Sequence, residues 1–377
     1  MSYDAIVVGA GPAGSVTAYH LAEAGASVLL LDRARFPRDK PCGGGLTYRA
    51  IRELPIAVDP VVEDVVDKFE FGFRYRHRFE RRSASTIILM TQRRRLDAFL
   101  AEQAAAAGAE FRDGAKVTAV DPAGSVTVGG ETIRASVVIG ADGVNGVAGR
   151  SLGLDTSYRY GVALEGNVPY RYARAKRYRG RAVLELGVVP GGYGWVFAKG
   201  DHVNVGVGGW ESEGPRLRDH LRRLCAAHDI PEGEVGSLRG YRLPLRRPQD
   251  ALVRGRALVV GDAAGLVDPL SGDGMYEGFV SARLASEAAL DLIVGRADTL
   301  GPYAGALTGA LSSQASASWA AKRALDRFPR LVYGFARLPP VWRFADALLR
   351  GELRSPSDAR GTAKAPLKVV KALGMAR

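Results

Sequence analysis

The chain has 377 residues, 47% of them hydrophobic, so it can bury a large core and form two or three structural units. Its formal net charge of +12 is consistent with binding of phosphates, anionic lipid or nucleic acid, and equally with a solvated Arg-rich surface. The sequence has no zinc-finger spacing, no RNA-binding aromatic signature and no long basic run, so we expect no nucleic-acid partner. Two cysteines are too few for a disulfide framework and lack metal-ligand spacing, so we expect no bound metal. The sequence shows no signal peptide and no apolar run of roughly 18 residues, so we expect a cytoplasmic protein without a membrane span.

The N-terminal stretch DAIVVGAGPAGSVTAYHLAEAGASVLLLDR predicts a strand, a turn, a helix and a second strand. The first apolar run reaches Val8, the helix extends from about Pro12 to Ala24, and SVLLLD forms the second strand. This order is typical of a βαβ unit with parallel strands.

Gly9, Gly11 and Gly14 form the pattern G-x-G-x-x-G directly after the first strand and at the start of the helix. The first glycine makes the turn, the second admits a pyrophosphate, and the third lets helix and strand pack closely, while free N–H groups at the helix start attract negative charge. Asp32, 23 residues after Gly9, suits a ribose hydroxyl and disfavours a 2′-phosphate. The motif predicts dinucleotide binding, and by itself it does not distinguish NAD from FAD.

The middle of the chain changes from helical to strand patterns. RRRLDAFLAEQAAAAGAEF predicts a helix closed by Gly108, and SVTVGGETIR predicts two strands joined by the hairpin dipeptide Gly129-Gly130. Long alternating runs over residues 161–209 are typical of an antiparallel sheet with one covered face.

After that region the α/β pattern returns. ALVVGDAAG predicts a buried strand, which is followed by a helix from about Met275 to Val294 and by helix-compatible sequence beyond residue 301. A polar, basic tail from about Arg354 is expected to be loosely ordered. The dinucleotide-type unit is therefore predicted to be split, with the sheet inserted within it.

Two segments resemble the flavin-binding segments of flavoproteins built like the aromatic hydroxylases. They are GADGVNGVAGRSLG at residues 140–153, with Asp142 and Gly143, and LVVGDAAGLVDPLSGDGMYEGFVSARLA at residues 258–285. Arg93, in RRRLD, stands where this family often has an Arg that faces the cofactor. The resemblance implies that the cofactor is FAD.

The same resemblance implies roles within the second segment. Asp262 would accept a hydrogen bond from the ribityl chain. Pro269, Gly272 and Gly274 would let the backbone approach the isoalloxazine. The helix that begins near Met275 would point its positive end at the pyrimidine side of the ring.

We therefore predict an α/β fold with a split Rossmann-like FAD-binding domain, an inserted antiparallel-sheet substrate domain and a C-terminal helical region with a basic tail. The expected bounds are 1–75, 92–155 and 240–300 for the FAD-binding domain, 76–91 and 156–239 for the substrate domain, and 301–377 for the helical region. The stretch at 328–354 mixes Phe, Trp, Leu and Arg, which suits either a peripheral membrane contact or a helical pair packed on the body.

Within that superfamily, KPCGGGLTYRA at residues 40–50 and PGGYGWVFAKGDHVNVGVG at residues 190–208 resemble the geranylgeranyl reductase family. The resemblance extends to about residue 300. It implies an FAD-dependent oxidoreductase that saturates carbon–carbon double bonds of a hydrophobic isoprenoid or lipid substrate, with a hydride from reduced flavin and a proton for the other carbon. The electron donor is left open between NAD(P)H and ferredoxin, as is the oligomeric state. Ala198 replaces a proline that relatives commonly carry, so the strand can keep an additional N–H donor there.

In that family the Cys-Gly-Gly-Gly loop lies beside the flavin, where a side chain would obstruct the ring or the substrate. The resemblance implies that the Cys42 thiol faces the reaction space, and a thiol of pKa about 8.5 is mostly protonated at neutral pH and can supply or relay the proton. Equally, Cys42 is a small buried hydrophobe that only shapes the cavity. Tyr48, Tyr193, Tyr276 and an ordered water are rival donors.

Tyr193, Trp195 and Phe197 are spaced two apart, so they share one face of a strand. If that face is the cavity, they form an aromatic wall for an apolar chain; otherwise they are ordinary core. Lys199 is expected either to meet a phosphate at the mouth of the cavity or to be a solvated strand-end residue.

The expected site residues fall into three groups. The catalytic residues are Cys42, Tyr193 and Trp195, and the substrate-binding residues are Gly44, Gly45, Tyr193, Trp195 and Phe197. The FAD-binding residues are Gly9, Gly11, Ala13, Gly14, Asp32, Arg33, Cys42, Gly43, Gly44, Arg93, Asp142, Gly143, Asp262, Pro269, Gly272, Gly274 and Met275.

Two other functions share part of this pattern. A flavin monooxygenase or halogenase acting on an apolar secondary metabolite would keep the fold, but the stretch YGWVFAK lacks the Trp-x-Trp-x-x-Pro segment expected of a halogenase. A non-catalytic isoprenoid or lipid carrier would keep the pocket, but it has no need of the flavin segments.

Overall fold

A largely parallel sheet forms around the first strand in the computed structural model, which describes residues 2–154, 158–245, 251–353 and 358–375. Its parallel strands lie in the order β18 (Ala257–Val259), β11 (Glu131–Gly140), β1 (Ser2–Val8), β2 (Val28–Leu31) and β8 (Glu110–Arg112). Antiparallel pairs extend it: β17 (Val253–Arg254) with β18, and β10 (Ser125–Val128) with both β11 and β9 (Val117–Asp121). Residues 257–259 thus complete a sheet that residues 2–8 begin.

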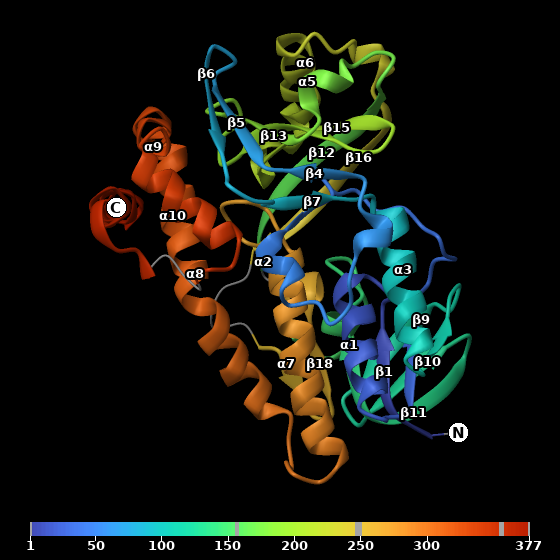
Figure 1. The fold of residues 1–377 in the computed structure, drawn as a ribbon. Coiled ribbons are helices and arrows are strands. Elements are labelled where there is room, and N and C mark those ends of the chain that lie inside the picture. Colours follow the sequence, from blue (N-terminus) through green and yellow to red (C-terminus); the bar gives the residue numbers. More distant parts are fainter. Residues whose placement is uncertain (1, 155–157, 246–250, 354–357, 376–377) are drawn as a thin grey trace.

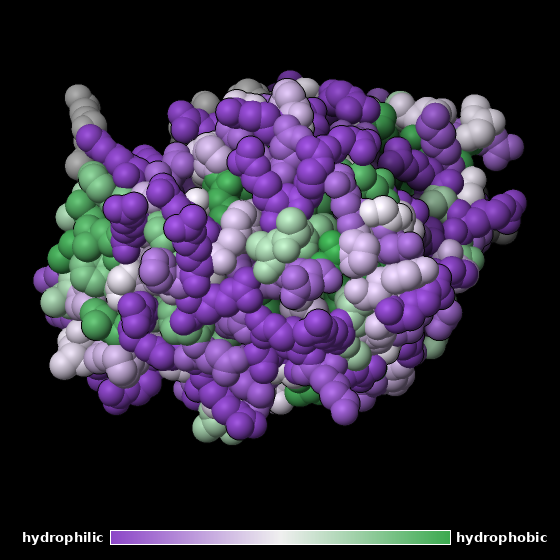
Figure 2. All heavy atoms as spheres, turned by 90° about the horizontal axis from the view of Figure 1, so that it is seen from above, coloured by the Kyte–Doolittle hydropathy of each residue, from purple (hydrophilic) through white to green (hydrophobic). Residues whose placement is uncertain are grey.

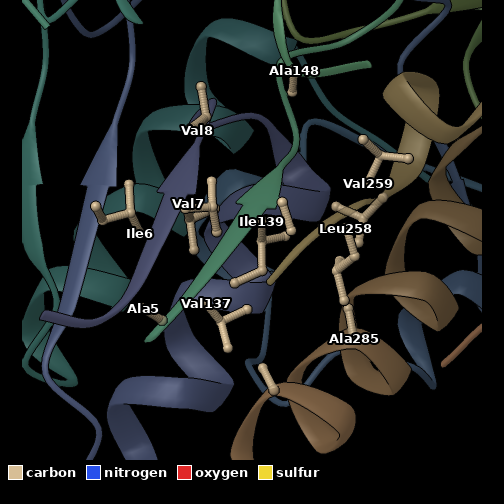
Figure 3. Close-up of a cluster of buried hydrophobic side chains, with 14 of the residues drawn as sticks. Ala5, Ile6, Val7, Val8, Val137, Ile139, Ala148, Leu258, Val259 and Ala285 are labelled. Atoms are coloured by element: carbon tan, nitrogen blue, oxygen red, sulfur yellow. The ribbon is translucent and has the colours of Figure 1, made fainter. Parts of the chain in front are cut away.

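Apolar side chains fill both faces of the central strands, as a parallel sheet covered by helices requires. Ile6 and Val7 of β1, Ile139 of β11 and Leu258 of β18 are fully buried, together with Ala285 of helix α7 (Met275–Ile293) (Figure 3). Burying a Val, Ile or Leu side chain stabilises the fold by roughly 1.5–3 kcal/mol. This layer holds in place the turns at the carboxyl ends of the strands.

Long helices pack on this sheet. Helix α1 (Pro12–Glu23) contacts both α3 (Arg93–Ala106) and α7, and the short α4 (Ala148–Ser151) follows β11. Helix α8 (Gly301–Arg327) runs along α7 (Figure 1). Near its start, the Tyr303 hydroxyl donates a hydrogen bond to the carbonyl oxygen of Val259 in β18 at 3.0 Å. Pro12 suits the first turn of α1, and Gly25, with φ +85°, follows its end.

A second sheet lies beyond the first (Figure 1). Its strand order among the described residues is β16 (Gly236–Leu245), β12 (Arg159–Pro169), β15 (His202–Trp210), β14 (Tyr193–Ala198), β13 (Arg181–Leu186), β5 (Lys68–Phe73) and β6 (His77–Arg82). All neighbours are antiparallel except β13 and β5. Helix α6 (Leu217–Ala227) covers one face with Leu221 and Leu224, and α5 (Ala175–Tyr178) contacts the central strands β13, β14 and β15.

A small sheet lies between the two larger ones. It consists of β3 (Gly45–Thr47), β7 (Ile88–Met90) and β4 (Asp64–Val66), and the short α2 (Tyr48–Ile51) follows β3 (Figure 1). The Cys-Gly-Gly-Gly loop therefore enters a strand at Gly45, which ties it to the boundary of the two large sheets.

The C-terminal helices α9 (Pro329–Ala336), α10 (Pro339–Leu349) and α11 (Lys364–Met375) return to the second sheet and to α8. The Trp342 ring of α10 packs 5.8 Å from Phe69 and 6.4 Å from Phe71, and its Nε1 donates to the Arg82 carbonyl oxygen at 3.1 Å. Among the described residues, no helix has the length and apolar character to cross a bilayer.

The predicted α/β class, the βαβ unit, the helix closed by Gly108 and the hairpin at Gly129-Gly130 are confirmed. The second sheet starts earlier than the expected bound at residue 76, because β5 pairs with β13, and continues beyond residue 239 with β16. The expectation of a loosely ordered tail is wrong for residues 364–375, which form α11 against α8 (residues 354–357 lie outside the described part). A Cβ on Gly374 would lie 1.9 Å from the Ala320 carbonyl oxygen, so the two helices are in close contact.

Candidate active site

The turn between β1 and α1 leaves no room for side chains at two of its glycines. Gly9 has φ +105°, and a Cβ there would lie 2.4 Å from the Ala141 carbonyl oxygen. A Cβ on Gly14 would lie 1.8 Å from the Gly9 carbonyl oxygen. Helix and strand are therefore in the close contact that the third glycine of the motif requires.

Two guanidinium groups face Gly11 at the start of α1. A Cβ on Gly11 would lie 3.7 Å from Nη2 of Arg38 and 3.9 Å from Nη2 of Arg93. The buried Asp97 holds both groups, because Arg93 donates to its carboxylate at 2.7 and 2.8 Å and Arg38 donates at 2.7 Å. Burial opposes the charge of Arg93, but the Asp97 carboxylate outweighs burial and raises the pKa of Arg93. No side chain of the described residues caps the start of α1, so N–H groups and two cations are available to one anion.

Asp32 lies directly after β2, at the same edge of the sheet. Its Oδ2 accepts a hydrogen bond from the Ala10 N–H at 2.9 Å, and its Oδ1 accepts one from the Ala34 N–H at 2.8 Å. A carboxylate has about four acceptor positions, so Asp32 keeps capacity for a ribose hydroxyl. Arg33 is exposed at the rim of the same cavity.

Asp142 follows β11 and binds the chain beyond it. Its Oδ2 accepts hydrogen bonds from the N–H groups of Val147 and Ala148 at 2.5 and 2.9 Å. Burial raises the pKa of Asp142, although the two hydrogen bonds act to lower it. A Cβ on Gly146 would lie 2.1 Å from the Asp142 Cγ, so the Asp-Gly segment closes on itself and presents Gly143 to the cavity.

Asp262 forms a second acidic position on the cavity wall. Its Oδ2 accepts hydrogen bonds from the Lys40 ammonium and from the Tyr241 hydroxyl, both at 2.9 Å. Burial opposes the carboxylate, but the Lys40 charge and the two hydrogen bonds outweigh burial and lower the pKa of Asp262. Asp262 is therefore an ionised acceptor at neutral pH.

The turn before α7 is held by Asp268. Its Oδ1 accepts hydrogen bonds from the Ser271 N–H at 2.8 Å and from the Ser271 hydroxyl at 2.9 Å. Gly272 has φ +70°, and it lines the cavity together with Pro269 and with Gly274 at the start of α7. The N-terminus of α7 therefore opens towards the cavity.

Each glycine of the Cys-Gly-Gly-Gly loop, residues 43–45, packs against a different neighbour. A Cβ on these glycines would meet, in chain order, the Phe197 ring at 3.1 Å, the Thr91 carbonyl oxygen at 2.1 Å and Cγ2 of Ile88 at 3.0 Å. The middle glycine also has φ +79°. The packing of the loop itself thus excludes a side chain at Gly44 and leaves little room for one at Gly43 and Gly45.

Cys42 lies between the cavity and a small polar pocket. Its N–H donates to Oε1 of Glu165 at 2.6 Å, and its carbonyl oxygen accepts from Nζ of Lys199 at 3.3 Å. Its Sγ accepts from the Gly44 N–H at 3.4 Å. Burial raises the pKa of Glu165 and lowers the pKa of Lys199, although their opposite charges act the other way. Burial therefore disfavours the charged form of both side chains, relative to an exposed ion pair.

The polar pocket behind Cys42 measures about 20 Å³, enough for one water molecule. Its wall combines buried and exposed polar side chains: Glu165, Lys199 and Asn204 inside, and Ser237 and Arg239 at the surface. The pocket thus connects the back of the Cys42 loop with the outside of the molecule.

Tyr193, Trp195 and Phe197 project from one face of β14 into the cavity, whereas Val196 packs in the core under α6. Successive ring centroids lie 6.1 and 6.4 Å apart. Nε1 of Trp195 donates to Oδ1 of Asn204 at 2.8 Å. The three rings form a continuous aromatic wall opposite the glycine loop.

These elements enclose a cavity of about 860 Å³. One end reaches the glycine turn and the two guanidinium groups. The other end lies between the second sheet and the C-terminal helices and is lined by apolar side chains, including Phe69, Phe71, Leu184, Leu325, Trp342 and Leu349. Cys42 lies on the wall between the two ends.

The structure places the predicted site residues on this cavity with one exception, Gly14, which packs beneath the turn. Of the rival proton donors, Tyr48 and Tyr276 do not line it: Tyr48 is 39% exposed, and the Tyr276 ring lies under the Arg49 guanidinium at 3.9 Å. Both expectations for Lys199 are wrong, because it is 3% exposed and lies under the Cys42 loop.

Sequence reasoning missed several residues of the site, namely Arg38, Lys40, Glu165, Asn204, Tyr241 and Trp342. Glu165 carried a usable signal, because it is an acid in the otherwise apolar strand GVALEGNVP and shares a strand face with Gly161 and Ala163. The others depend on contacts between distant segments.

The residues present fit FAD. Gly11 leaves open space in front of the buried Arg93 guanidinium, the half-buried Arg38 guanidinium and an uncapped helix start, which is the donor set that a pyrophosphate requires. Asp32 and the ionised Asp262 are acceptors for sugar hydroxyls on either side of it.

Comparison with known proteins agrees with this geometry. A family model described as FAD binding domain matches residues 2–298. The menaquinone reductase of Mycobacterium tuberculosis is 33% identical over 310 residues, 76% of this chain and 76% of that protein. The chloroplastic geranylgeranyl diphosphate reductase of Oryza sativa subsp. japonica is 32% identical over 314 residues, 75% of this chain and 65% of that protein.

Solved structures share the fold. A geranylgeranyl bacteriochlorophyll reductase-like protein from Thermoplasma acidophilum superposes with a TM-score of 0.80 at 22% identity and covers 99% of both chains. A flavin-dependent brominase superposes with a TM-score of 0.75 at 17% identity over 98% of both chains. The fold is thus common to flavoproteins that carry out different reactions.

Proposed function

Because the chain belongs to the FAD binding domain family and is an FAD-dependent oxidoreductase of the geranylgeranyl reductase kind, we propose that it saturates carbon–carbon double bonds of an isoprenoid chain. The observation that carries this proposal is the arrangement of the cavity. Its FAD end, its apolar end and the Cys42 loop between them lie on one continuous wall. A double bond in an apolar chain that fills the far end would reach the loop.

The apolar end supports a prenyl substrate. The side chains of Phe71 and Leu184, which line it, have no hydrogen-bonding groups. Trp342 lines it too, and its Nε1 already donates to the Arg82 carbonyl oxygen. Ring faces of Trp195 and Phe197 continue this surface towards the glycine loop. A flexible hydrocarbon chain is held by such a wall through buried area rather than by polar contacts.

At the other end the chain holds and orients FAD, which when reduced supplies a hydride to one carbon of the double bond. Arg38, Arg93 and the start of α1 would hold the pyrophosphate. Asp32 and Asp262 would accept hydrogen bonds from sugar hydroxyls. Gly143, Pro269, Gly272, Gly274 and Met275 line the same end of the cavity, where the small or backbone surfaces allow close approach.

The proton for the second carbon comes, in this proposal, from the Cys42 thiol. The S–H bond breaks as the C–H bond forms, and a thiolate remains at Sγ. The Gly44 N–H at 3.4 Å and the positive charge of Lys199 beneath the loop stabilise that thiolate. Glu165 and the polar pocket offer a path along which a proton from solvent returns to Sγ.

Tyr193 is less suited to this task. Its hydroxyl donates to the Ser271 carbonyl oxygen, so its proton is already engaged. Burial raises the pKa of Tyr193, which makes the phenolate left after proton donation unfavourable. We assign Tyr193 and Trp195 to the wall that positions the substrate.

The test is anaerobic incubation of the dithionite-reduced protein with a panel of prenyl alcohols, prenyl diphosphates and prenylated quinones, followed by mass spectrometry. The proposal predicts products heavier by the mass of two hydrogens for each bond reduced, together with reoxidation of the flavin spectrum. Oxygen-dependent gain of an oxygen or halogen atom, with no hydrogenated product under anaerobic conditions, would instead identify a monooxygenase or halogenase.

A further inference from the structure

The last fifth of the chain carries most of the net positive charge. Residues 301–377 contain 13 Lys and Arg against 4 Asp and Glu, a net charge of +9, whereas the whole chain carries +12. The preceding 300 residues therefore have a net charge of only +3. Such a concentration of cations on one region attracts an anionic partner.

Apolar side chains are exposed among these cations. Leu331 and Leu338 near α9 are 43% and 40% exposed, and Val369 and Met375 of α11 are 43% and 63% exposed. Exposed cations stand on or directly beside the same helices, namely Arg330, Arg337, Lys364, Lys368 and Lys371. We call these nine residues the C-terminal face. Figure 2 shows apolar atoms gathered at the left of the view, over the C-terminal helices, next to hydrophilic ones.

The inner sides of the neighbouring helices line the apolar end of the cavity. Leu325 of α8, Val332 of α9, and Trp342, Ala345 and Leu349 of α10 all contribute to that wall. Helix α9, which bears part of the C-terminal face, therefore lies between the apolar end of the cavity and the outside, and α11, which bears the rest of the face, packs on α8. A hydrophobic surface on the outside and a hydrophobic cavity on the inside belong to the same group of helices.

We propose that the C-terminal face docks on a lipid bilayer that contains anionic lipids, and that the isoprenoid substrate reaches the cavity from that bilayer. Interspersed cations and apolar side chains on amphipathic helices are suited to the headgroup boundary, where apolar groups are buried and cations meet anionic lipids. A second copy of this chain is a poorer occupant, because two faces of like charge repel each other. The docking stands on the face alone, and only the route of the substrate rests on the proposed function.

The experiment uses the full-length, FAD-loaded protein and measures its binding to vesicles of phosphatidylcholine with and without phosphatidylglycerol. We expect binding to the anionic vesicles and its loss at high salt. The triple variant Lys364→Gln, Lys368→Gln, Lys371→Gln removes three cations from the face and should weaken binding by about a hundredfold. The double variant Leu331→Ser, Val369→Ser removes apolar contact and should weaken it about tenfold.

A matched control removes three exposed cations from the first sheet and a loop next to it, at the other end of the molecule: Lys116→Gln, Arg134→Gln and Arg254→Gln. This variant should bind vesicles nearly as well as the unchanged protein. Equal weakening by the control and by the α11 variant would overturn the proposal, because net charge alone would then explain the binding. So would a change of oligomeric state, measured by light scattering, that follows the α11 substitutions without any effect on vesicles.

Reduction of a short, detergent-dispersed prenyl substrate separates this proposal from the proposed function. If the protein docks on anionic vesicles through the C-terminal face but reduces no prenyl double bond, the docking proposal holds and the proposed function is wrong. If the unchanged protein reduces the prenyl substrate but the C-terminal substitutions do not change vesicle binding, the proposed function holds and the docking proposal is wrong.

Discussion

The Lys199 ammonium lies 3.3 Å from the carbonyl oxygen of Cys42, a residue 157 positions earlier in the chain. Lys199 is at the end of β14 and Cys42 precedes β3, so the contact joins the second sheet to the loop that faces the cavity. The N–H of the same cysteine is bound by Glu165 at 2.6 Å. The cysteine is thus held between a buried cation and a buried acid.

Cys42→Ala should reduce turnover by about 10²- to 10⁴-fold, the usual contribution of a general acid, with little change in KM. The substitution is small and should leave FAD binding intact, which the flavin absorbance of the purified variant checks. Steady-state rates across the pH range give the measurement. Unchanged turnover at every pH would remove the thiol from the reaction and leave it a filler of the cavity wall.

The charges around Cys42 predict opposite effects on its reactivity. Lys199→Met removes a cation that stabilises the thiolate, so alkylation of Cys42 by iodoacetamide at a fixed pH should slow. Glu165→Gln removes a negative charge, so alkylation should become faster. The assay needs no substrate and no flavin, because it follows the thiol directly by mass spectrometry.

The chain itself provides the control for this assay. Its other cysteine, Cys225, is 1% exposed in the core under α6, and burial raises the pKa of Cys225 to about 11, so it should remain unmodified. Cys42→Ala should abolish labelling. Equal rates in the Lys199 and Glu165 variants would show that neither charge acts on the thiol.

Two glycine substitutions in one motif should separate folding from cofactor binding. Gly14→Ala places a Cβ 1.8 Å from a backbone oxygen and should lower the free energy of unfolding by about 1–3 kcal/mol. Gly11→Ala meets nothing closer than 3.7 Å and should change that free energy by less than about 0.5 kcal/mol. Its methyl group nevertheless occupies the space in front of Arg38 and Arg93, so the dissociation constant for FAD should rise. An unchanged FAD affinity in Gly11→Ala would place the pyrophosphate elsewhere.

Lys322 predicts a pH dependence of stability. It is 6% exposed on the cavity wall, and burial lowers the pKa of Lys322 from 10.5 to about 8. Between these values the unfolded chain keeps the proton that the folded protein has lost, so stability should rise as pH increases from 8 to 10.5, by roughly 3 kcal/mol. Lys322→Met should lack this increment. Denaturant unfolding of both proteins across this range gives the difference, and parallel curves would contradict the assignment.

Local signals predicted most of the first sheet and the antiparallel strands within residues 161–209, but not the full strand order of the second sheet. A glycine turn, a helix start and a hairpin dipeptide each act within a few residues, so α1, α3 and the β10–β11 hairpin were predictable. The place of β5 was not, because Lys68 pairs in parallel with Arg181 and no short-range pattern encodes that partner.

The candidate site divides in the same way. The residues that we propose to approach FAD, such as Gly11, Asp32 and Asp262, can be found from motifs, because each is a turn glycine or an acid that follows a strand. Lys199 could not be placed, because its burial depends on a loop 157 residues earlier folding over it. Motif spacing therefore predicts the residues around Gly11 better than the buried polar groups behind Cys42.

The strand β18 has a consequence for synthesis of the protein on the ribosome. It pairs with β11 in the sheet that β1 begins, yet it is translated only after β12 to β16 of the second sheet. The nucleotide end of the cavity receives Asp262 and the turn before α7 only when residues 257–275 have emerged. The growing polypeptide can thus form most of the second sheet before the wall around Gly11 is complete, so we expect it to retain FAD only late in its synthesis.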